Sequence, residues 1–244
     1  MSPPKKDRIY ADKLVEVHGF EFNEEVADVF PDMIRRSVPG YEVLGTLLQI
    51  IARRFVSEGT HVYDLGCSLG TASLRIAEAL YPERVKIFAV DNSPVMIQRL
   101  AGKLESLNRD FRINPVCCDV SEISIENASL VILNYTLQFI DPVKRDALLM
   151  KIYSGMTQGS AMLLSEKIMH EQVDEESFMQ DLHDRYKLAQ GYSDLEISQK
   201  REALENVMVR DTDTHHLERL RRAGFSRIYV LMKHLNFISY IAIK

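Results

Sequence analysis

The sequence has few cysteines and lacks any apolar run of membrane-spanning length. Its 244 residues include only Cys67, Cys117 and Cys118, an odd number without a CxxC pair. This pattern argues against both a disulfide framework and a zinc site. Apolar stretches such as 130–133 fall far short of the roughly 20 residues that a transmembrane helix needs. Because no apolar segment follows the charged residues 1–8, we expect no secretion signal and a cytoplasmic protein with reduced thiols.

A basic charge balance is also missing. The formal net charge is −5, whereas proteins that bind a phosphate backbone use many lysines and arginines. Local basic clusters occur at 35–36, 53–54 and 219–222, and we interpret them as solvated helix faces. The histidines show no HxxxH or HxH spacing, and the adjacent pair His215 and His216 is a poor ligand pair. We therefore predict no direct binding of nucleic acid and no metal site.

The composition and the periodicity predict a globular α/β protein. Hydrophobic residues make up 46% of the chain, enough for a large core. Short apolar segments alternate with helical patterns, as in βαβ units, so their strands should form a parallel sheet. These five segments are residues 60–65, 85–90, 112–118, 129–135 and 161–165. The fold class is therefore Rossmann-like, with helices on both faces of a mostly parallel sheet.

Two further strands are predicted at the carboxyl-terminal end, at 227–235 and 237–243. The connection between them is so short that only an antiparallel hairpin fits, which brings the sheet to seven strands. We divide the single domain into four parts. They are a helical cap (1–56), an α/β core (57–165), a charged helical insertion acting as a lid or dimer surface (166–212), and the last helix with the hairpin (213–244). Within the cap, Pro31 and Pro39-Gly40 are expected to break helices.

Glycines follow the first predicted strand, in the segment 64–70. Gly66 permits a tight turn, and the small residues Cys67 and Ser68 keep the loop narrow. The loop lacks the GxGxxG spacing and has no lysine or arginine to meet phosphates, so pyrophosphate binding is disfavoured. An ordinary glycine turn before a helix remains the alternative, and Cys67 is interpreted as a turn residue rather than a nucleophile.

Polar residues also end the next three strands, where open α/β sheets bind ligands. Asp91 can accept both hydroxyl groups of a ribose, with Asn92 beside it, although it could also cap the next helix. Asp119 and Val120 suit the amino group and flat face of an adenine, or form a surface turn. Asn134 could bind an amino-acid group or hold a neighbouring loop. This ordered set fits S-adenosyl-L-methionine, which carries no phosphate, better than NAD.

Two residues elsewhere fit the same ligand. Arg201 lies between Ile197 and Leu204 on one face of a helix predicted over 197–208. An arginine among apolar neighbours needs an anionic partner, either a ligand carboxylate or an acid of the protein. Tyr41, after Pro39-Gly40, could place a phenol at the mouth of the cleft or serve only in packing.

Several segments together resemble the bacterial carboxy-S-adenosyl-L-methionine synthase family, within the class I S-adenosylmethionine-dependent methyltransferase superfamily. The matching segments are residues 29–41, 62–70, 91–94, 133–139 and 191–201. The stretches 29–41 and 191–208 are the most specific, whereas many methyltransferases share the glycine loop. The resemblance begins near residue 20 and covers most of the chain.

The resemblance implies that S-adenosyl-L-methionine is the substrate and prephenate the carboxyl source, with carboxy-S-adenosyl-L-methionine and phenylpyruvate as products. A second enzyme then uses the product to build 5-oxyacetyl uridine at the tRNA wobble position. The resemblance also implies a homodimer, with carboxy-S-adenosyl-L-methionine or S-adenosyl-L-homocysteine as ligands that can be found bound. The implied ligand set is Tyr41, Gly66, Cys67, Ser68, Asp91, Asn92, Asp119, Val120, Asn134 and Arg201.

Arg201 is the predicted catalytic residue, because the product carries one more negative charge than the substrate and guanidinium matches carboxylate geometry. Two alternatives remain open. One is an ordinary methyltransferase acting on a small molecule or RNA, which would need the same strand-end residues but not Arg201. The other is a non-catalytic nucleoside-binding subunit of a tRNA-modification complex.

Overall fold

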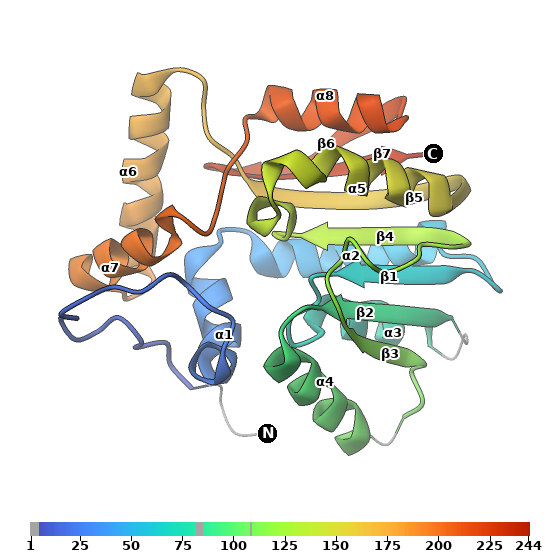
Figure 1. The fold of residues 1–244 in the computed structure, drawn as a ribbon, viewed down its shortest axis with the longest axis horizontal. Coiled ribbons are helices and arrows are strands. Elements are labelled where there is room, and N and C mark those ends of the chain that lie inside the picture. Colours follow the sequence, from blue (N-terminus) through green and yellow to red (C-terminus); the bar gives the residue numbers. More distant parts are fainter. Residues whose placement is uncertain (1–4, 82–84, 108) are drawn as a thin grey trace.

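The computed structural model describes residues 5–81, 85–107 and 109–244, which form one seven-stranded sheet with helices on both faces (Figure 1). The strands are β1 (His61–Leu65), β2 (Lys86–Asp91), β3 (Ile113–Cys117), β4 (Ala128–Asn134), β5 (Met156–Lys167), β6 (Arg227–His234) and β7 (Phe237–Ile243). The helices are α1 (Glu24–Ser37), α2 (Tyr41–Phe55), α3 (Thr71–Leu80), α4 (Pro94–Ser106), the 3-10 turn η1 (Leu137–Phe139), α5 (Pro142–Gly155), α6 (Val173–Ala189), α7 (Asp194–Glu205) and α8 (Asp213–Ala223).

The strand order confirms the predicted fold class. It runs β3-β2-β1-β4-β5-β7-β6, with parallel pairing from β3 to β5 and antiparallel pairing where β7 meets β5 and β6. The order reverses between β1 and β4, because β2 lies on one side of β1 and β4 on the other. Such a switch point separates two neighbouring crossover connections and leaves a crevice at the carboxyl ends of the strands.

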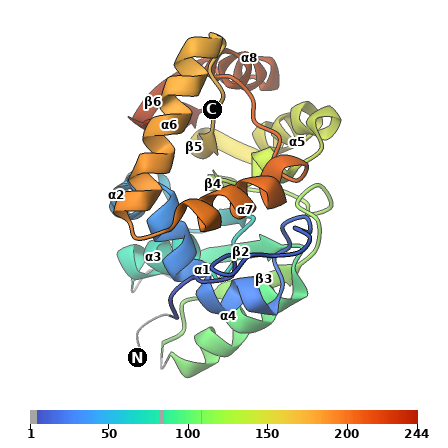
Figure 2. The ribbon, with the colours of Figure 1, turned by 90° about the vertical axis from the view of Figure 1, so that its left-hand side faces the viewer.

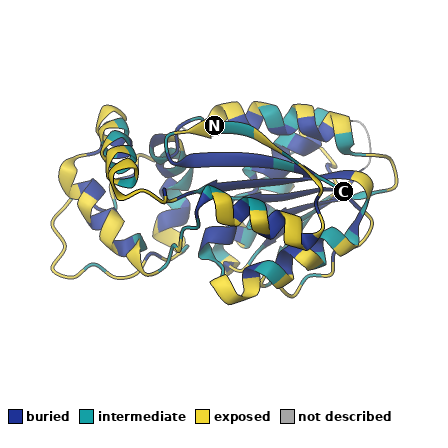
Figure 3. Ribbon diagram, turned by 90° about the horizontal axis from the view of Figure 1, so that it is seen from above, coloured by how far each residue is buried: buried dark blue, intermediate teal, exposed yellow. Residues whose placement is uncertain are grey.

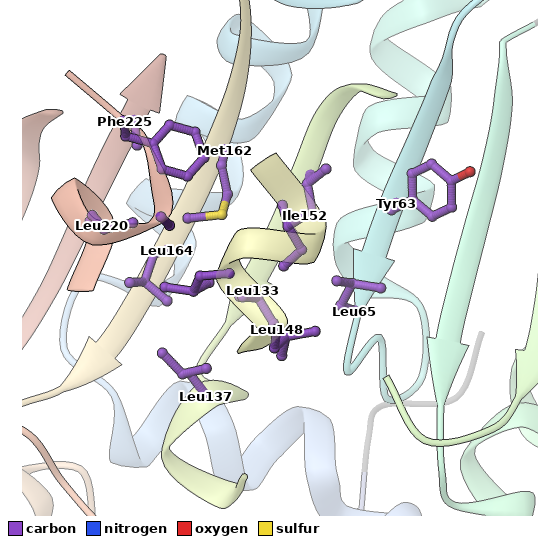
Figure 4. Close-up of a cluster of buried hydrophobic side chains, with 14 of the residues drawn as sticks. Tyr63, Leu65, Leu133, Leu137, Leu148, Ile152, Met162, Leu164, Leu220 and Phe225 are labelled. Carbon is purple, nitrogen blue, oxygen red and sulfur yellow. The ribbon is translucent and has the colours of Figure 1, made fainter. Parts of the chain in front are cut away.

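β4 illustrates why the sheet is buried on both faces. Val131 and Leu133 belong to one hydrophobic cluster and Leu130 and Ile132 to another, because successive side chains of a strand alternate between faces. The first cluster includes residues of α5 and α8 and is drawn in Figure 4, and the second includes residues of α2 and α3. In Figure 3 the strands appear mainly as buried ribbon between helices whose outer faces are exposed. Each fully buried leucine or isoleucine stabilises the fold by about 1.5–3 kcal/mol.

The structure corrects three predicted boundaries. Pro31 does not break a helix but lies inside α1. The helix continues past the missing hydrogen bond because its apolar face, including Met33, is buried in a cluster with residues of the amino-terminal segment. β5 extends well beyond 161–165 at both ends. The helix expected over 197–208 ends at Glu205 as α7.

The insertion over 166–212 leaves the sheet after β5 and returns beside its own starting point, where Met169 and Thr212 form a parallel bridge. Its helices α6 and α7 lie with α1 beyond the end of the sheet where β4 terminates (Figures 1 and 2). The amino-terminal segment crosses α7, and the backbone N–H of Phe20 donates to the carbonyl of Ala203 at 2.9 Å. The insertion and the cap thus cover the crevice together. No helix in the described ranges is long and apolar enough to cross a membrane.

Candidate active site

A cavity of about 1110 Å³ opens at the carboxyl ends of the parallel strands. Its walls come from the loops after β1, β2, β3 and β4 on one side and from α1, α6 and α7 on the other. All the predicted ligand-binding residues line it, namely Tyr41, Gly66, Cys67, Ser68, Asp91, Asn92, Asp119, Val120, Asn134 and Arg201. The structure therefore brings together residues that lie up to 160 positions apart in the sequence (201 − 41).

The glycine loop is held against the end of β2. The backbone N–H groups of Gly66 and Cys67 both donate to the carbonyl of Val90, at 2.8 and 2.9 Å. Gly66 has φ +79°, and a Cβ atom there would collide with the side chain of Thr136. Ser68 also has a positive φ, of 49°. Only glycine fits the first of these positions without strain, so this turn needs a glycine at position 66.

The Asp91 carboxylate joins the glycine loop to the next turn. One oxygen accepts the backbone N–H of Ser68 at 2.8 Å, and the other accepts that of Ser93 at 2.9 Å. The Ser93 hydroxyl itself caps α4 by accepting the N–H of Met96 at 3.3 Å. Burial raises the pKa of Asp91. Ser93 rather than Asp91 therefore caps the helix, whereas Asp91 stabilises the two turns and lines the cavity together with the exposed Asn92.

Asp119 and Asn134 differ in whether the protein supplies hydrogen-bond partners for their side-chain oxygens. One oxygen of Asp119 accepts both the hydroxyl and the backbone N–H of Ser121, at 2.6 and 2.7 Å, and these bonds lower its pKa. That is the surface turn anticipated as an alternative, with buried Val120 beside it. The Oδ1 atom of Asn134, by contrast, is buried and has no hydrogen-bond partner among the described residues. An unsatisfied buried acceptor costs about 1–3 kcal/mol, so this atom is suited to a donor on a ligand.

The side chains of Tyr41 and Cys67 are held neutral. Burial and the nearby Asp64 raise the pKa of Tyr41 to about 12. Burial, followed by the carboxylates of Asp64 and Asp91, raises the pKa of Cys67, so its thiol stays protonated. A protonated buried thiol is a poor nucleophile, which fits the interpretation of Cys67 as a turn residue.

Arg201 occupies a different environment from the one expected. Its side chain is 56% exposed and forms an ion pair with Asp184 of α6. The prediction that Arg201 lies on an apolar face of the helix is wrong. Leu204 is only half-buried, and the residues that α7 buries include Gln199 and Lys200. Arg201 still lines the cavity, while its guanidinium is paired with Asp184.

A group of basic residues on the far side of the cavity was not predicted from the sequence. Lys167 is the last residue of β5, and Lys187, Lys200 and Arg210 come from α6, α7 and the segment after α7. Burial lowers the pKa of Lys167 to about 7 and that of Lys200 to about 8. The strand-end rule that identified Asp91 could have found Lys167. No local pattern marks the others, because the fold alone brings them to this cavity. No group of three His, Cys, Asp or Glu side chains arranged to hold a metal occurs in the described parts of the chain.

A family model described as a methyltransferase domain matches residues 62–159. The chain is 48% identical over 243 residues to the carboxy-S-adenosyl-L-methionine synthase of Trichlorobacter lovleyi, covering 98% of this chain and 99% of that protein. It is 44% identical over 239 residues to the protein of the same name from Escherichia coli O1:K1, covering 98% of this chain and 97% of the relative.

Solved structures share the fold at low sequence identity. An S-adenosylmethionine-dependent methyltransferase of Methanococcus maripaludis aligns with a TM-score of 0.61 and 19% identity, over 95% of this chain and 97% of that one. Human N-acetylserotonin methyltransferase, in complex with S-adenosylmethionine, aligns with a TM-score of 0.60 and 18% identity, over 90% of this chain and 56% of the human one. These likenesses establish the class I methyltransferase fold.

Proposed function

The chain belongs to the carboxy-S-adenosyl-L-methionine synthase family, and we propose that it converts S-adenosyl-L-methionine into carboxy-S-adenosyl-L-methionine with prephenate as the carboxyl source. The observation that carries the proposal is a single cavity lined both by the complete predicted ligand set and by a group of basic side chains. A sulfonium substrate with a net positive charge does not need several cations nearby, but a dianionic second substrate does. Methyl transfer alone leaves these cations unexplained.

The reaction balances without a redox partner. Prephenate loses carbon dioxide and its ring hydroxyl and becomes phenylpyruvate. The methyl carbon of the sulfonium loses a proton and forms a bond to the carbon dioxide, and the proton leaves with the hydroxyl as water. In this scheme Asp91 binds the ribose hydroxyls, Asn134 accepts a donor of the amino-acid part, and Arg201 binds the new carboxylate. Closing the cavity with the insertion would exclude water and strengthen these electrostatic contacts.

We propose two features of the biological context. The product supplies a later enzyme that makes 5-oxyacetyl uridine at the tRNA wobble position, since the net charge of −5 gives this chain little affinity of its own for tRNA. The chain also forms a homodimer. Exposed apolar side chains on the insertion, such as Val173 and Phe178, support a contact there. Light scattering of the purified protein, alone and as Phe178→Glu, tests the dimer.

The deciding experiment is incubation with S-adenosyl-L-methionine and prephenate, followed by mass spectrometry of the nucleoside product. We expect a mass gain of one carbon dioxide that requires prephenate. We expect Arg201→Ala to lose most of this product, whereas Arg185→Ala removes a similarly exposed, ion-paired arginine that does not line the cavity and should change little. Product with a methylated acceptor instead would support an ordinary methyltransferase. Tight nucleoside binding without any turnover would support a non-catalytic binding subunit.

A further inference from the structure

Three side chains form a distinct corner of the cavity. Lys167 comes from the end of β5, His183 from α6 and Phe237 from the start of β7, and all three line the cavity. The Nζ atom of Lys167 lies 5.9 Å from the centre of the Phe237 ring. The centre of the His183 ring lies 5.0 Å from the centre of the same Phe237 ring. A cation and an imidazole therefore both lie near one aromatic ring, in the half of the sheet away from β2 and β3.

Lys167 differs from Lys187, Lys200 and Arg210 in having no carboxylate partner among the described residues. Lys187 pairs with Asp184 at 2.9 Å, and Arg210 pairs with Glu176 at 2.6 Å. Lys200 is 3.5 Å from a carboxylate oxygen of the amino-terminal segment. Among the described residues, the only side-chain hydrogen bond of the Lys167 ammonium goes to the neutral amide of Gln180, at a long 3.4 Å. Its charge is therefore available to an anion in the cavity.

His183 offers the complementary group, an acceptor. Its Nε2 atom lies 2.8 Å from the carbonyl oxygen of Ser37. A carbonyl can only accept, so Nε2 carries the hydrogen. Burial, with the charges of Lys167 and Lys187, lowers the pKa of His183 to about 3, so the ring is neutral. The Nδ1 atom then presents a lone pair, and it is buried without a partner among the described residues.

We propose that Lys167 and His183 form the subsite for the anionic second substrate, with Lys167 binding a carboxylate and His183 Nδ1 accepting a hydrogen bond from a hydroxyl group. The ring of that substrate lies against Phe237. This inference rests on the proposed function and names the chemistry that the second substrate must carry. A cation and an acceptor that are both close to one aromatic ring select a cyclic hydroxy acid over a simple carboxylic acid.

The electrostatics of the corner support this assignment. Lys167 faces Glu176, His183, Asp184 and Lys187 of α6, and Arg210 approaches from the segment after α7. Burial and then the charges of Arg210 and Lys187 oppose protonation of Lys167 more than the two carboxylates favour it. A bound carboxylate would stabilise the ammonium and relieve this repulsion.

The test measures prephenate binding without turnover. Protein saturated with S-adenosyl-L-homocysteine, which has no methyl group to carboxylate, is titrated with prephenate in a calorimeter. We expect Lys167→Met to weaken prephenate binding at least about tenfold, the size of effect of losing a charged hydrogen bond. Lys167→Arg should recover most of the affinity. Lys233→Met is the matched control, because Lys233 is exposed on the edge strand β6 and lies outside the cavity.

His183 allows a sharper test with two substitutions. His183→Gln places an amide near the Nε2 position and can keep the bond to Ser37, but it removes the Nδ1 acceptor. His183→Asn places an amide oxygen near Nδ1 but cannot reach Ser37. If Nδ1 binds the hydroxyl, the Gln variant should lose more prephenate affinity than the Asn variant. If His183 only supports the fold, the Asn variant should lose more urea stability and the two should bind prephenate alike.

The outcomes separate this inference from the proposed function. Wild-type protein that carboxylates its substrate while Lys167→Met binds prephenate normally would overturn the subsite and leave the function intact. An equal loss of prephenate and S-adenosyl-L-homocysteine binding in Lys167→Met would mean a structural role only and would also overturn it. Wild-type protein that neither binds nor uses prephenate would overturn the proposed function and the subsite together.

Discussion

The two ends of the cavity are built by different means. At the end formed by β1, β2 and β3, short loops place backbone groups and carboxylates, and each loop is fixed by bonds to its neighbours, as Asp91 is fixed by Ser68 and Ser93. At the other end, long side chains reach in from β5, α6 and α7. Lys200 pairs with a residue 193 positions away, and His183 bonds to one 146 positions away.

The first end is of a kind that many proteins of this fold share, whereas the basic end is specialised. Strand-end loops at a switch point recur wherever this fold binds a nucleoside, because the backbone geometry creates them. The basic end has no such local origin and needs the insertion and the cap to be in place. Function within one fold is therefore decided at the end that the tertiary structure assembles.

The largest effect is expected in the glycine loop. Gly66→Ala should lower the free energy of unfolding by about 3–5 kcal/mol and abolish S-adenosyl-L-homocysteine binding, because strain at φ +79° adds to the collision with Thr136. Gly59 has nearly the same φ, +77°, but open space around it, so Gly59→Ala should cost only about 1–2 kcal/mol of strain. Urea unfolding measures the stability of the two variants, and calorimetric titration measures their binding of S-adenosyl-L-homocysteine. Equal losses would show that the collision is relieved by movement of Thr136.

The second-largest effect is expected for a substitution at Asp91, which tests whether the two ends of the cavity bind their ligands independently. Asp91→Asn should weaken S-adenosyl-L-homocysteine binding about 10–100-fold, because an amide oxygen cannot replace a carboxylate that binds several donors. The affinity for prephenate should stay unchanged, since Asp91 is outside the basic end. Asp110→Asn, which changes another turn-capping aspartate, serves as the control. A parallel loss of prephenate binding would mean that the ends are coupled.

The basic end should also show its own pH dependence. Lys167 has a pKa of about 7, so its charge is present below that pH and is lost above it. The value of kcat/KM for prephenate should therefore fall by up to about tenfold per pH unit as the pH rises above 7. His183, with a pKa of about 3, stays neutral throughout and adds no change. In Lys167→Arg the fall should disappear, and identical profiles for the two proteins would assign the titration to another group.

The smallest effect concerns stability. Arg201→Ala should lower the free energy of unfolding by less than about 1 kcal/mol, because its ion pair with Asp184 is exposed. Its carboxy-S-adenosyl-L-methionine affinity should fall far more than its S-adenosyl-L-homocysteine affinity, since only the former has the extra carboxylate. Chemical denaturation and titration with each nucleoside check this. A loss of several kcal/mol in stability would make Arg201 a structural residue.

The sheet was predictable because its signals are local. The apolar runs, the glycines and the polar residues that follow each strand marked all seven strands and the loops that meet in the cavity. The face of α7 was not predictable. Gln199 and Lys200 are buried rather than Arg201, because the amino-terminal segment lies over them and Gln199 donates to the carbonyls of Tyr10 and Asp12, at 3.0 and 2.9 Å. Helical periodicity identifies neighbours on a helix but not which segment will cover them.

The sequence by itself determined the class of fold, the positions of the strand-end loops and the nucleoside chemistry they suit, since each depends on residues close together in the chain. Only the tertiary structure decided which cations share the cavity, that Lys167 has no carboxylate partner in the described parts of the chain, and that His183 carries its hydrogen on Nε2. Those properties depend on burial and on partners distant in the sequence, and both arise only when the cap, the insertion and the sheet are packed together.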